Sequence, residues 1–143
     1  MFVKQVSVFL ENRLGRLAMV ARTLANNNID ISAMALADTT NFGILRMIVN
    51  DPDRAVEVLR EAEFTVSTND VLAVEVNDRP GGLAQVLEVL QGNNISIEYA
   101  YSFIKRSGDK AFILFRVENP EKAVELLKGS GVRVLDEKEV YAL

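Results

Sequence analysis

The chain has 143 residues, of which 49% are hydrophobic and 25% are charged, and its formal net charge is −4. This length allows one ordinary domain or two very small ones, and the acidic balance disfavours a protein that coats nucleic-acid phosphates. Because the sequence contains neither cysteine nor histidine, disulfides, zinc ribbons and thiol catalysis are excluded, and the commonest metal ligand is missing.

No apolar run approaches the roughly 20 residues that a membrane helix requires. The segment 1–6 reads as a strand and lacks the basic-then-apolar order of a signal peptide. We therefore expect a soluble cytoplasmic protein, and no motif in the sequence calls for a cofactor.

The first half predicts the order strand, helix, strand, strand, helix, strand. Alternating apolar residues predict strands at 3–10, 29–37, 42–49 and 64–66, with hairpin chemistry at 38–41. Helical spacing predicts one helix from Leu17 to Leu24, ended by three asparagines that tolerate the left-handed conformation. A second helix should start at Pro52, with Asp51 as its cap.

The second half repeats this order. It predicts strands at 72–76, 95–103, 111–117 and 132–135, a helix at 83–90, a turn at 107–109 and a second helix from Pro120. Asn12 falls on Asp78, 66 positions later, and Pro52 falls on Pro120, 68 positions later. Two extra residues near Ser107 explain the difference. Matches at nearly one shift indicate an internal repeat, so we expect two domains, 1–68 and 69–143.

Assembly can also be inferred from the pattern. The join at 67–70 is too short for a flexible tether, so the two modules should touch or share an edge. The strands 42–49 and 111–117 are apolar on both faces, although Arg46 and Arg116 interrupt them, which favours burial by the other module or by a second chain. We expect a homo-oligomer, most simply a homodimer. The tail 139–143 predicts an extra edge strand.

Each half also contains a sharp turn between its first strand and first helix. The turns read Asn12-Arg13-Leu14-Gly15-Arg16-Leu17 and Asp78-Arg79-Pro80-Gly81-Gly82-Leu83. Together with the tandem βαββαβ order, they resemble ACT domains, and the whole chain is similar to small stand-alone tandem-ACT proteins. The first turn departs from the family's usual pattern, because Leu14 stands where proline is typical.

The resemblance implies an α+β fold of two ferredoxin-like modules, each an antiparallel sheet with helices on one face. It also implies a non-catalytic regulatory function, in which an amino acid binds between two ACT modules and the bound state is signalled to a partner enzyme. The ligand-binding residues carried over from the family lie in the two turns and at the start of each second strand: Asn12, Leu14, Gly15, Arg16, Leu17 and Asp30, and Asp78, Pro80, Gly81, Gly82, Leu83 and Ser96.

The chemistry of these turns is consistent with that role. Glycine lets a ligand approach the backbone, and N–H groups at a helix start suit a carboxylate. An Asn or Asp oxygen can accept from an ammonium group. Arg16 adds positive charge in the first turn only. Gly82 replaces it in the second, and this pair of glycines favours the Asp78–Gly81 turn as the roomier site.

Simpler interpretations remain open. Gly15 and Gly81 can serve only to form a turn, Asn12 and Asp78 can act as local turn or capping residues, and Pro80 can be a helix-start residue. The aromatic residues of the long second-half strand are expected in a core or an interface: Tyr99, Tyr101 and Phe103.

Three other functions compete with the sensor. A ligand-free structural or oligomerisation module is the alternative. RNA recognition is disfavoured because Phe112 and Phe115 should point to opposite sheet faces and the chain is acidic. An enzyme is disfavoured because the sequence shows no paired carboxylates, phosphate loop or nucleophile motif.

Overall fold

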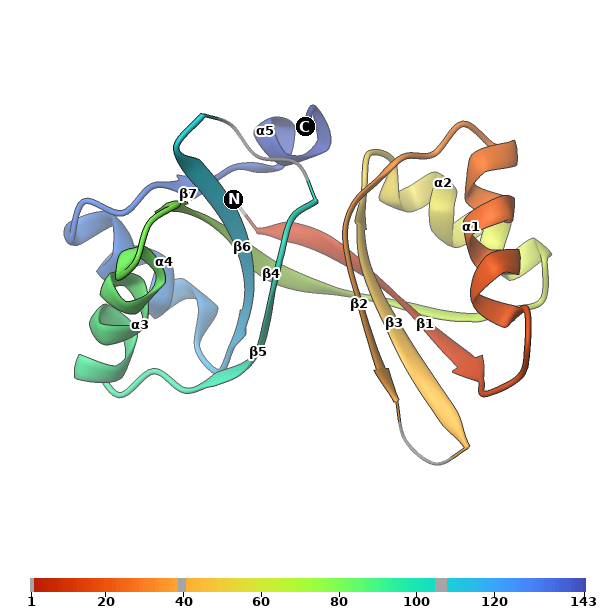
Figure 1. Ribbon diagram of the computed structural model, residues 1–143, viewed down its shortest axis with the longest axis horizontal. Coiled ribbons are helices and arrows are strands. Elements are labelled where there is room, and N and C mark those ends of the chain that lie inside the picture. Colours follow the sequence, from red (N-terminus) through yellow and green to blue (C-terminus); the bar gives the residue numbers. More distant parts are fainter. Residues whose placement is uncertain (1, 39–40, 105–107) are drawn as a thin grey trace. The chain divides into compact units, whose positions relative to one another are not determined.

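The structure is a computed structural model that describes residues 2–38, 41–104 and 108–143. Its helices and strands follow the predicted order through both halves (Figure 1). In chain order they are β1 (Val3–Glu11), α1 (Arg16–Asn26), β2 (Ile31–Asp38), β3 (Phe42–Val49), α2 (Pro52–Glu61), β4 (Thr65–Asn77), α3 (Gly82–Gly92), β5 (Ile97–Ser102), β6 (Lys110–Val117), α4 (Pro120–Gly129), β7 (Val134–Leu135) and α5 (Glu137–Tyr141).

The chain divides into two compact units. Lys4–Asn69 together with Tyr141–Leu143 form one, called here the N-terminal unit. Met1–Val3 together with Asp70–Val140 form the other, the C-terminal unit. Each unit therefore includes a short segment from the opposite end of the chain.

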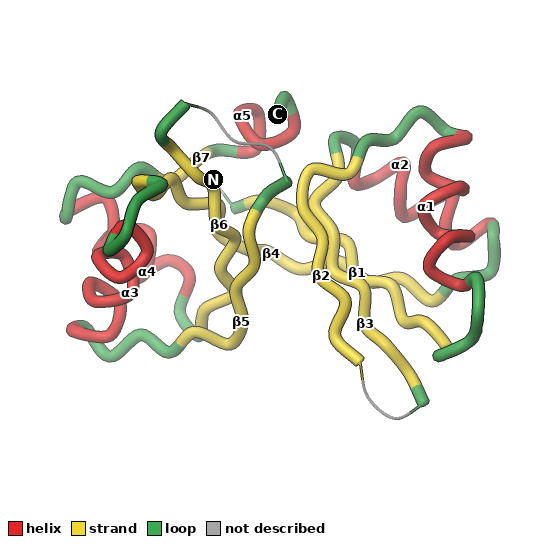
Figure 2. The backbone as a smooth tube through the Cα atoms, viewed as in Figure 1, coloured by secondary structure: helices red, strands yellow, loops and turns green. Residues whose placement is uncertain are grey.

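The N-terminal unit has the strand order β2-β3-β1-β4. β3 pairs antiparallel with both neighbours, so that Leu45 lies opposite Val8 on one side and Leu36 on the other. Helices α1 and α2 cover one face of this sheet (Figure 2). The core between sheet and helices includes Val8 and Leu45 with Val20 of α1 and Leu59 of α2.

The C-terminal unit repeats this arrangement with the order β7-β4-β6-β5. Val74 of β4 lies opposite Ile113 of β6, and Leu114 lies opposite Tyr101 of β5. Helices α3 and α4 pack on one face, with Leu90 and Leu127 in the core. The predicted fold, two ferredoxin-like βαββαβ modules, is confirmed.

Local signals explain why the helices begin and end where they do. The Asp51 carboxylate accepts a hydrogen bond from the Arg54 N–H at 3.2 Å, and the Asn119 side chain accepts from the Lys122 N–H at 3.3 Å. The asparagine stops also behave as predicted, since Asn28 has a φ of 57° after α1 and the corresponding residue after α3 has a φ of 58°.

The second strand of each half begins two residues later than predicted. The Ile29 N–H donates to the Leu24 carbonyl at 2.9 Å, and the Ile95 N–H donates to the Leu90 carbonyl at 2.9 Å. These bonds close the carboxyl ends of α1 and α3. The first apolar residue after each helix therefore belongs to the helix cap, and the strand starts after it.

The prediction of an edge strand at 139–143 is wrong, because this tail contains the short helix α5. The Glu139 N–H donates to the Asp136 carboxylate at 2.9 Å, and the Asp136 N–H donates to the Glu139 carboxylate at 3.3 Å. This reciprocal pair is a capping box, which starts a helix. Val140 then points inward and is fully buried.

One other difference concerns a connection. The strand predicted at 64–66 and the one predicted at 72–76 are both part of β4, which runs unbroken from Thr65 to Asn77. The predicted turns at 38–41 and 107–109 fall partly on Thr39, Thr40 and Ser107, which lie outside the described residues. Within the described residues, no helix is long and apolar enough to span a membrane.

Candidate functional site

The two strand-to-helix turns have the same backbone. Gly15 and Gly81 occupy the helix N-cap positions with φ of 85° and 89°, in the left-handed region. Four residues later in each helix, the N–H groups of Met19 and Gln85 donate to these glycine carbonyls at 3.0 and 3.1 Å. A glycine is needed here because other residues rarely adopt this φ.

Side-chain caps distinguish α1 and α3 from α2 and α4. Within the described residues, no side chain caps α1 or α3, whereas α2 and α4 have Asp51 and Asn119. The first N–H groups of an uncapped helix have no partner in the helix itself and attract negative charge. This arrangement would suit a carboxylate at either turn.

The simpler roles suggested for Asn12, Asp78 and Pro80 fit the structure only in part. Gly15 and Gly81 are the caps, so Asn12 and Asp78 are not. Their backbone N–H groups instead donate to the backbone carbonyl oxygens of Asn41 and Asp109 at 3.0 and 2.8 Å. These bonds connect each turn to the neighbouring hairpin. Pro80 precedes the N-cap and lies in the turn, so the prediction that it starts the helix is wrong.

A wide hollow lies beside the first turn, on the side of α1 that faces β2, and is called here the β2-side hollow. It has a volume of about 600 Å³. Leu14, Gly15 and Leu17 form its rim, and Met34 of β2 forms part of its floor. Leu14 is fully exposed and Met34 is partly exposed, so an apolar surface stands open next to the uncapped helix start.

A smaller hollow of about 100 Å³ adjoins it, where Asn12 and Arg16 meet Leu17 and Leu36. The structure therefore brings together the five turn residues predicted in the first half. It does not bring Asp30 to them within the N-terminal unit. The Asp30 N–H instead donates to the Asn50 side-chain oxygen at 2.9 Å.

Arg16 is held away from the uncapped N–H groups by a contact that the sequence did not reveal. Its guanidinium carbon lies 4.5 Å from the centre of the Phe64 ring, an attractive cation–π arrangement. Its Nη1 reaches the Met19 sulfur at 3.8 Å. The Arg16 guanidinium therefore lies on the side of α1 that faces Phe64.

The predicted residues of the second half are spread apart. Asp78, Pro80 and Gly81 are exposed, and Leu83 is 43% exposed. Gly82 is buried and lines a cavity of about 450 Å³. Ser96 lines a different hollow, near the carboxyl end of α3, with a volume of about 510 Å³.

The charged residues of the Gly82 cavity were not among the predicted site residues. Glu75, Lys110 and Arg133 line it together with Gly82. The only sequence signal for this cavity was the replacement of Arg16 by Gly82 in the second copy. Its walls come from β4, β6 and the segment after α4, which no short motif connects.

Comparison with known proteins identifies a family that matches the whole sequence. The sequence matches the family described as "ACT domain pair" over residues 1–143. A crystal structure from Bacteroides thetaiotaomicron is 40% identical, covers 100% of this chain and 98% of its own, and has a TM-score of 0.94. No curated protein sequence matches the chain.

More distant structures share the fold alone. The ligand-free regulatory subunit of aspartate kinase from Thermus thermophilus is 16% identical, with a TM-score of 0.66 over 88% of this chain and 91% of its own. The regulatory subunit of aspartate kinase from Thermus flavus is 15% identical, with a TM-score of 0.62 over 87% of this chain and 88% of its own.

Proposed function

Because the chain belongs to the family of ACT domain pairs, we propose that it is a non-catalytic sensor that binds a free amino acid at a turn of an ACT module. The bound state would be passed to a partner enzyme of amino-acid or related metabolism. One observation carries the proposal: at Gly15 and Gly81, left-handed glycines are the N-caps, and no side chain among the residues that the structure describes caps these two helix starts. A cytoplasmic location is part of the same proposal.

The ligand's groups can be assigned to features of the first turn. The Arg16 N–H donates to the Arg13 carbonyl at 3.3 Å, so the carboxylate would accept from the next N–H groups of α1. The Asn12 side-chain oxygen would accept from the ammonium group. The β2-side hollow, with Leu14, Leu17 and Met34, would receive the side chain. Apolar lining of this kind favours an aliphatic amino acid over a charged one.

A second copy of the chain would complete the site. Leu17 and Met34 are 38% and 37% exposed, and Leu36 beside them is 47% exposed. Exposed apolar residues gathered around a binding site are typical of an interface. In a homodimer, the second-strand residue Asp30 or Ser96 of one module would face the turn of a neighbouring module and add an acceptor for the ammonium group.

A thermal-shift screen against the twenty proteinogenic amino acids tests the proposal. A ligand at about 100 times its dissociation constant adds about 2.7 kcal/mol to the free energy of unfolding, which raises Tm by several degrees. We expect at least one aliphatic amino acid to do so. If none of the twenty raises Tm, the sensor proposal fails.

Two variants assign the site. Gly15→Val and Gly81→Val each place a branched side chain at a left-handed φ where the ligand would approach. We expect the variant of the functional turn to lose amino-acid binding, while its circular dichroism spectrum shows that the fold is retained. Gly92→Ala, at the end of α3 with open space around it, is the control. Unchanged affinity in both valine variants would exclude the turns as the site.

A ligand-free oligomerisation module is the second candidate. Phe9 and Phe42 are 46% and 43% exposed, and their ring centroids lie 4.9 Å apart. Phe9 alternates with the core residues Val8 and Leu10, so this pair lies on the sheet face away from the helices. This candidate predicts a stable oligomer whose Tm no amino acid changes.

A further inference from the structure

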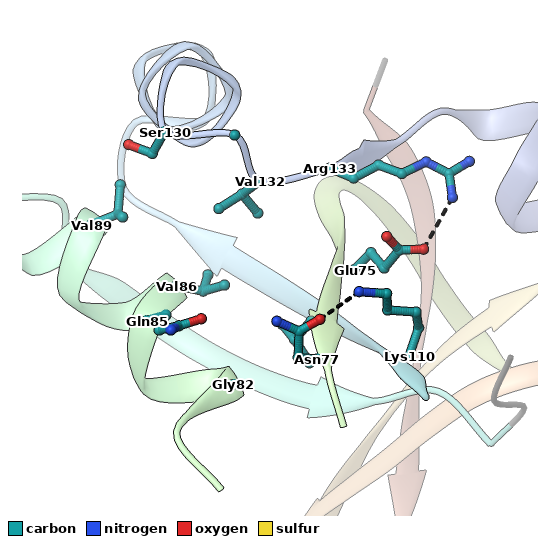
Figure 3. A pocket seen from close by; sticks show the side chains of 12 residues that line it. Glu75, Asn77, Gly82, Gln85, Val86, Val89, Lys110, Ser130, Val132 and Arg133 are labelled. Carbon is teal, nitrogen blue, oxygen red and sulfur yellow. Dashed lines mark hydrogen bonds and ion pairs between the residues drawn. The ribbon is translucent and has the colours of Figure 1, made fainter. Parts of the chain in front are cut away.

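A second cavity lies in the C-terminal unit, on the side of α3 that faces β4 and β7. It is called here the β7-side pocket, has a volume of about 450 Å³, and opens between α3, β4 and the segment that leads from α4 into β7. Figure 3 shows its two ends: Val86, Val89 and Val132 at one, and Glu75, Asn77, Lys110 and Arg133 at the other. Pockets of this size accommodate small molecules.

The N-terminal unit shows why this pocket is open. In the repeat, Arg16 corresponds to Gly82, 66 positions later, and Phe64 corresponds to Val132, 68 positions later. Arg16 lies against Phe64 and fills the space beside α1. With no side chain at Gly82 and a smaller one at Val132, the equivalent space beside α3 is empty of protein atoms.

The charges at the polar end are not equivalent. Arg133 donates to Glu75 at 3.1 Å and also pairs with Glu139, so two carboxylates share one guanidinium and Arg133 has no charge to spare for an anion. Lys110 Nζ donates to the neutral Asn77 side-chain oxygen, and in the described part of the chain it has no carboxylate partner. An ammonium group has three donors, which leaves Lys110 able to bind an anion.

We propose that the β7-side pocket binds a small amphipathic carboxylate, with the carboxylate on Lys110 Nζ and the apolar body against the three valines. Val86 is 3% exposed and forms the floor of the apolar end. The Gln85 side chain on the rim can donate to the second carboxylate oxygen. This ligand needs no ammonium group, which distinguishes it from the free amino acid proposed for the turns.

Methyl NMR on the full chain with 4-methylpentanoate as the probe tests the proposal. We expect the methyl resonances of Val86, Val89 and Val132 to shift, and those of Leu14 and Leu17 to stay in place. Since a hydrogen bond to a charged group contributes about 1.5–3 kcal/mol, Lys110→Met should weaken binding about tenfold or more. Lys122→Met, on the exposed surface of α4, should bind like the unmodified protein.

Two further measurements isolate shape and charge. Val132→Phe should abolish binding, because it restores the aromatic ring that fills the equivalent space in the N-terminal unit. The neutral probe 4-methylpentanamide should bind about tenfold more weakly than the carboxylate, since it carries no charge for Lys110. The proposal is overturned if the three valine methyls do not shift at millimolar probe, or if the amide binds as well as the carboxylate.

Discussion

The turns of the two units share a backbone conformation but open on opposite sides of the helix that follows. Beside α1 the open side faces β2, where Leu14 and Met34 line an apolar hollow. Beside α3 the open side faces β4 and β7, where Lys110 and Glu75 line a polar pocket. The difference shows that a repeated fold can present two unlike surfaces through changes at a few corresponding positions.

Two pairs of corresponding residues account for this difference. Arg16 and Phe64 close the β4 side of α1 by stacking, while Gly82 and Val132 leave the β4 side of α3 open. Gly82 also allows an unusually close approach, because a Cβ there would lie 1.9 Å from the Asn77 carbonyl oxygen. The glycine therefore determines both the pocket and the packing of the helix start.

The largest expected effect comes from Gly82→Ala. The added methyl group would overlap the Asn77 backbone, which cannot move as a flexible side chain would, so we expect a loss of about 3 kcal/mol in the free energy of unfolding. Urea denaturation measures this loss. Gly92→Ala, in the same helix but with open space around it, should instead be neutral or stabilising by up to about 1 kcal/mol. Equal stabilities of the two variants would show that the start of α3 shifts freely and that the close approach is unimportant.

A smaller effect, equal in both units, is expected for Gly15→Ala and Gly81→Ala. Their φ angles of 85° and 89° are nearly the same, and neither position has a neighbouring atom within reach of an added Cβ. Each substitution should therefore cost only the strain of a left-handed non-glycine residue, about 1–2 kcal/mol. Urea denaturation of the two variants compares them directly. A difference of more than about 1 kcal/mol would mean that the two turns are not equivalent in backbone strain.

Most of the fold could be predicted from the sequence because its signals are local. The Asp51 and Asn119 caps, the prolines that follow them and the asparagine stops act within a few residues, and the repeat shows each signal twice. The prediction for the tail was wrong because it followed the repeat, in which the tail corresponds to the strand that begins near Val71, whereas the capping box of Asp136 and Glu139 starts a helix. That signal was present in the sequence.

The site could be predicted only as far as its backbone. Glycines at Gly15 and Gly81 indicate the left-handed turns, and the structure shows them. Which side of α1 is open depends on where the Arg16 side chain points. That direction is set by Phe64, which is 48 positions away in the sequence. Packing between such distant residues has no local signature. The β2-side hollow could therefore not be foreseen, and the replacement of Arg16 by Gly82 was the one sequence signal for the β7-side pocket.

The smallest effect is expected at the capped helices, where the two units do not differ. Asp51 and Asn119 each accept one hydrogen bond from the backbone N–H three residues later, at 3.2 and 3.3 Å. Asp51→Ala and Asn119→Ala should each cost about 1 kcal/mol of unfolding free energy, measured by urea denaturation. Glu121→Ala, in the exposed first turn of α4, removes only a favourable interaction with the helix dipole and should cost less than about 0.5 kcal/mol. Equal losses at the two caps would place the divergence of the units in α1 and α3 rather than in α2 and α4. A cap variant that costs no more than Glu121→Ala would contradict the role of that hydrogen bond and would extend the divergence to α2 and α4.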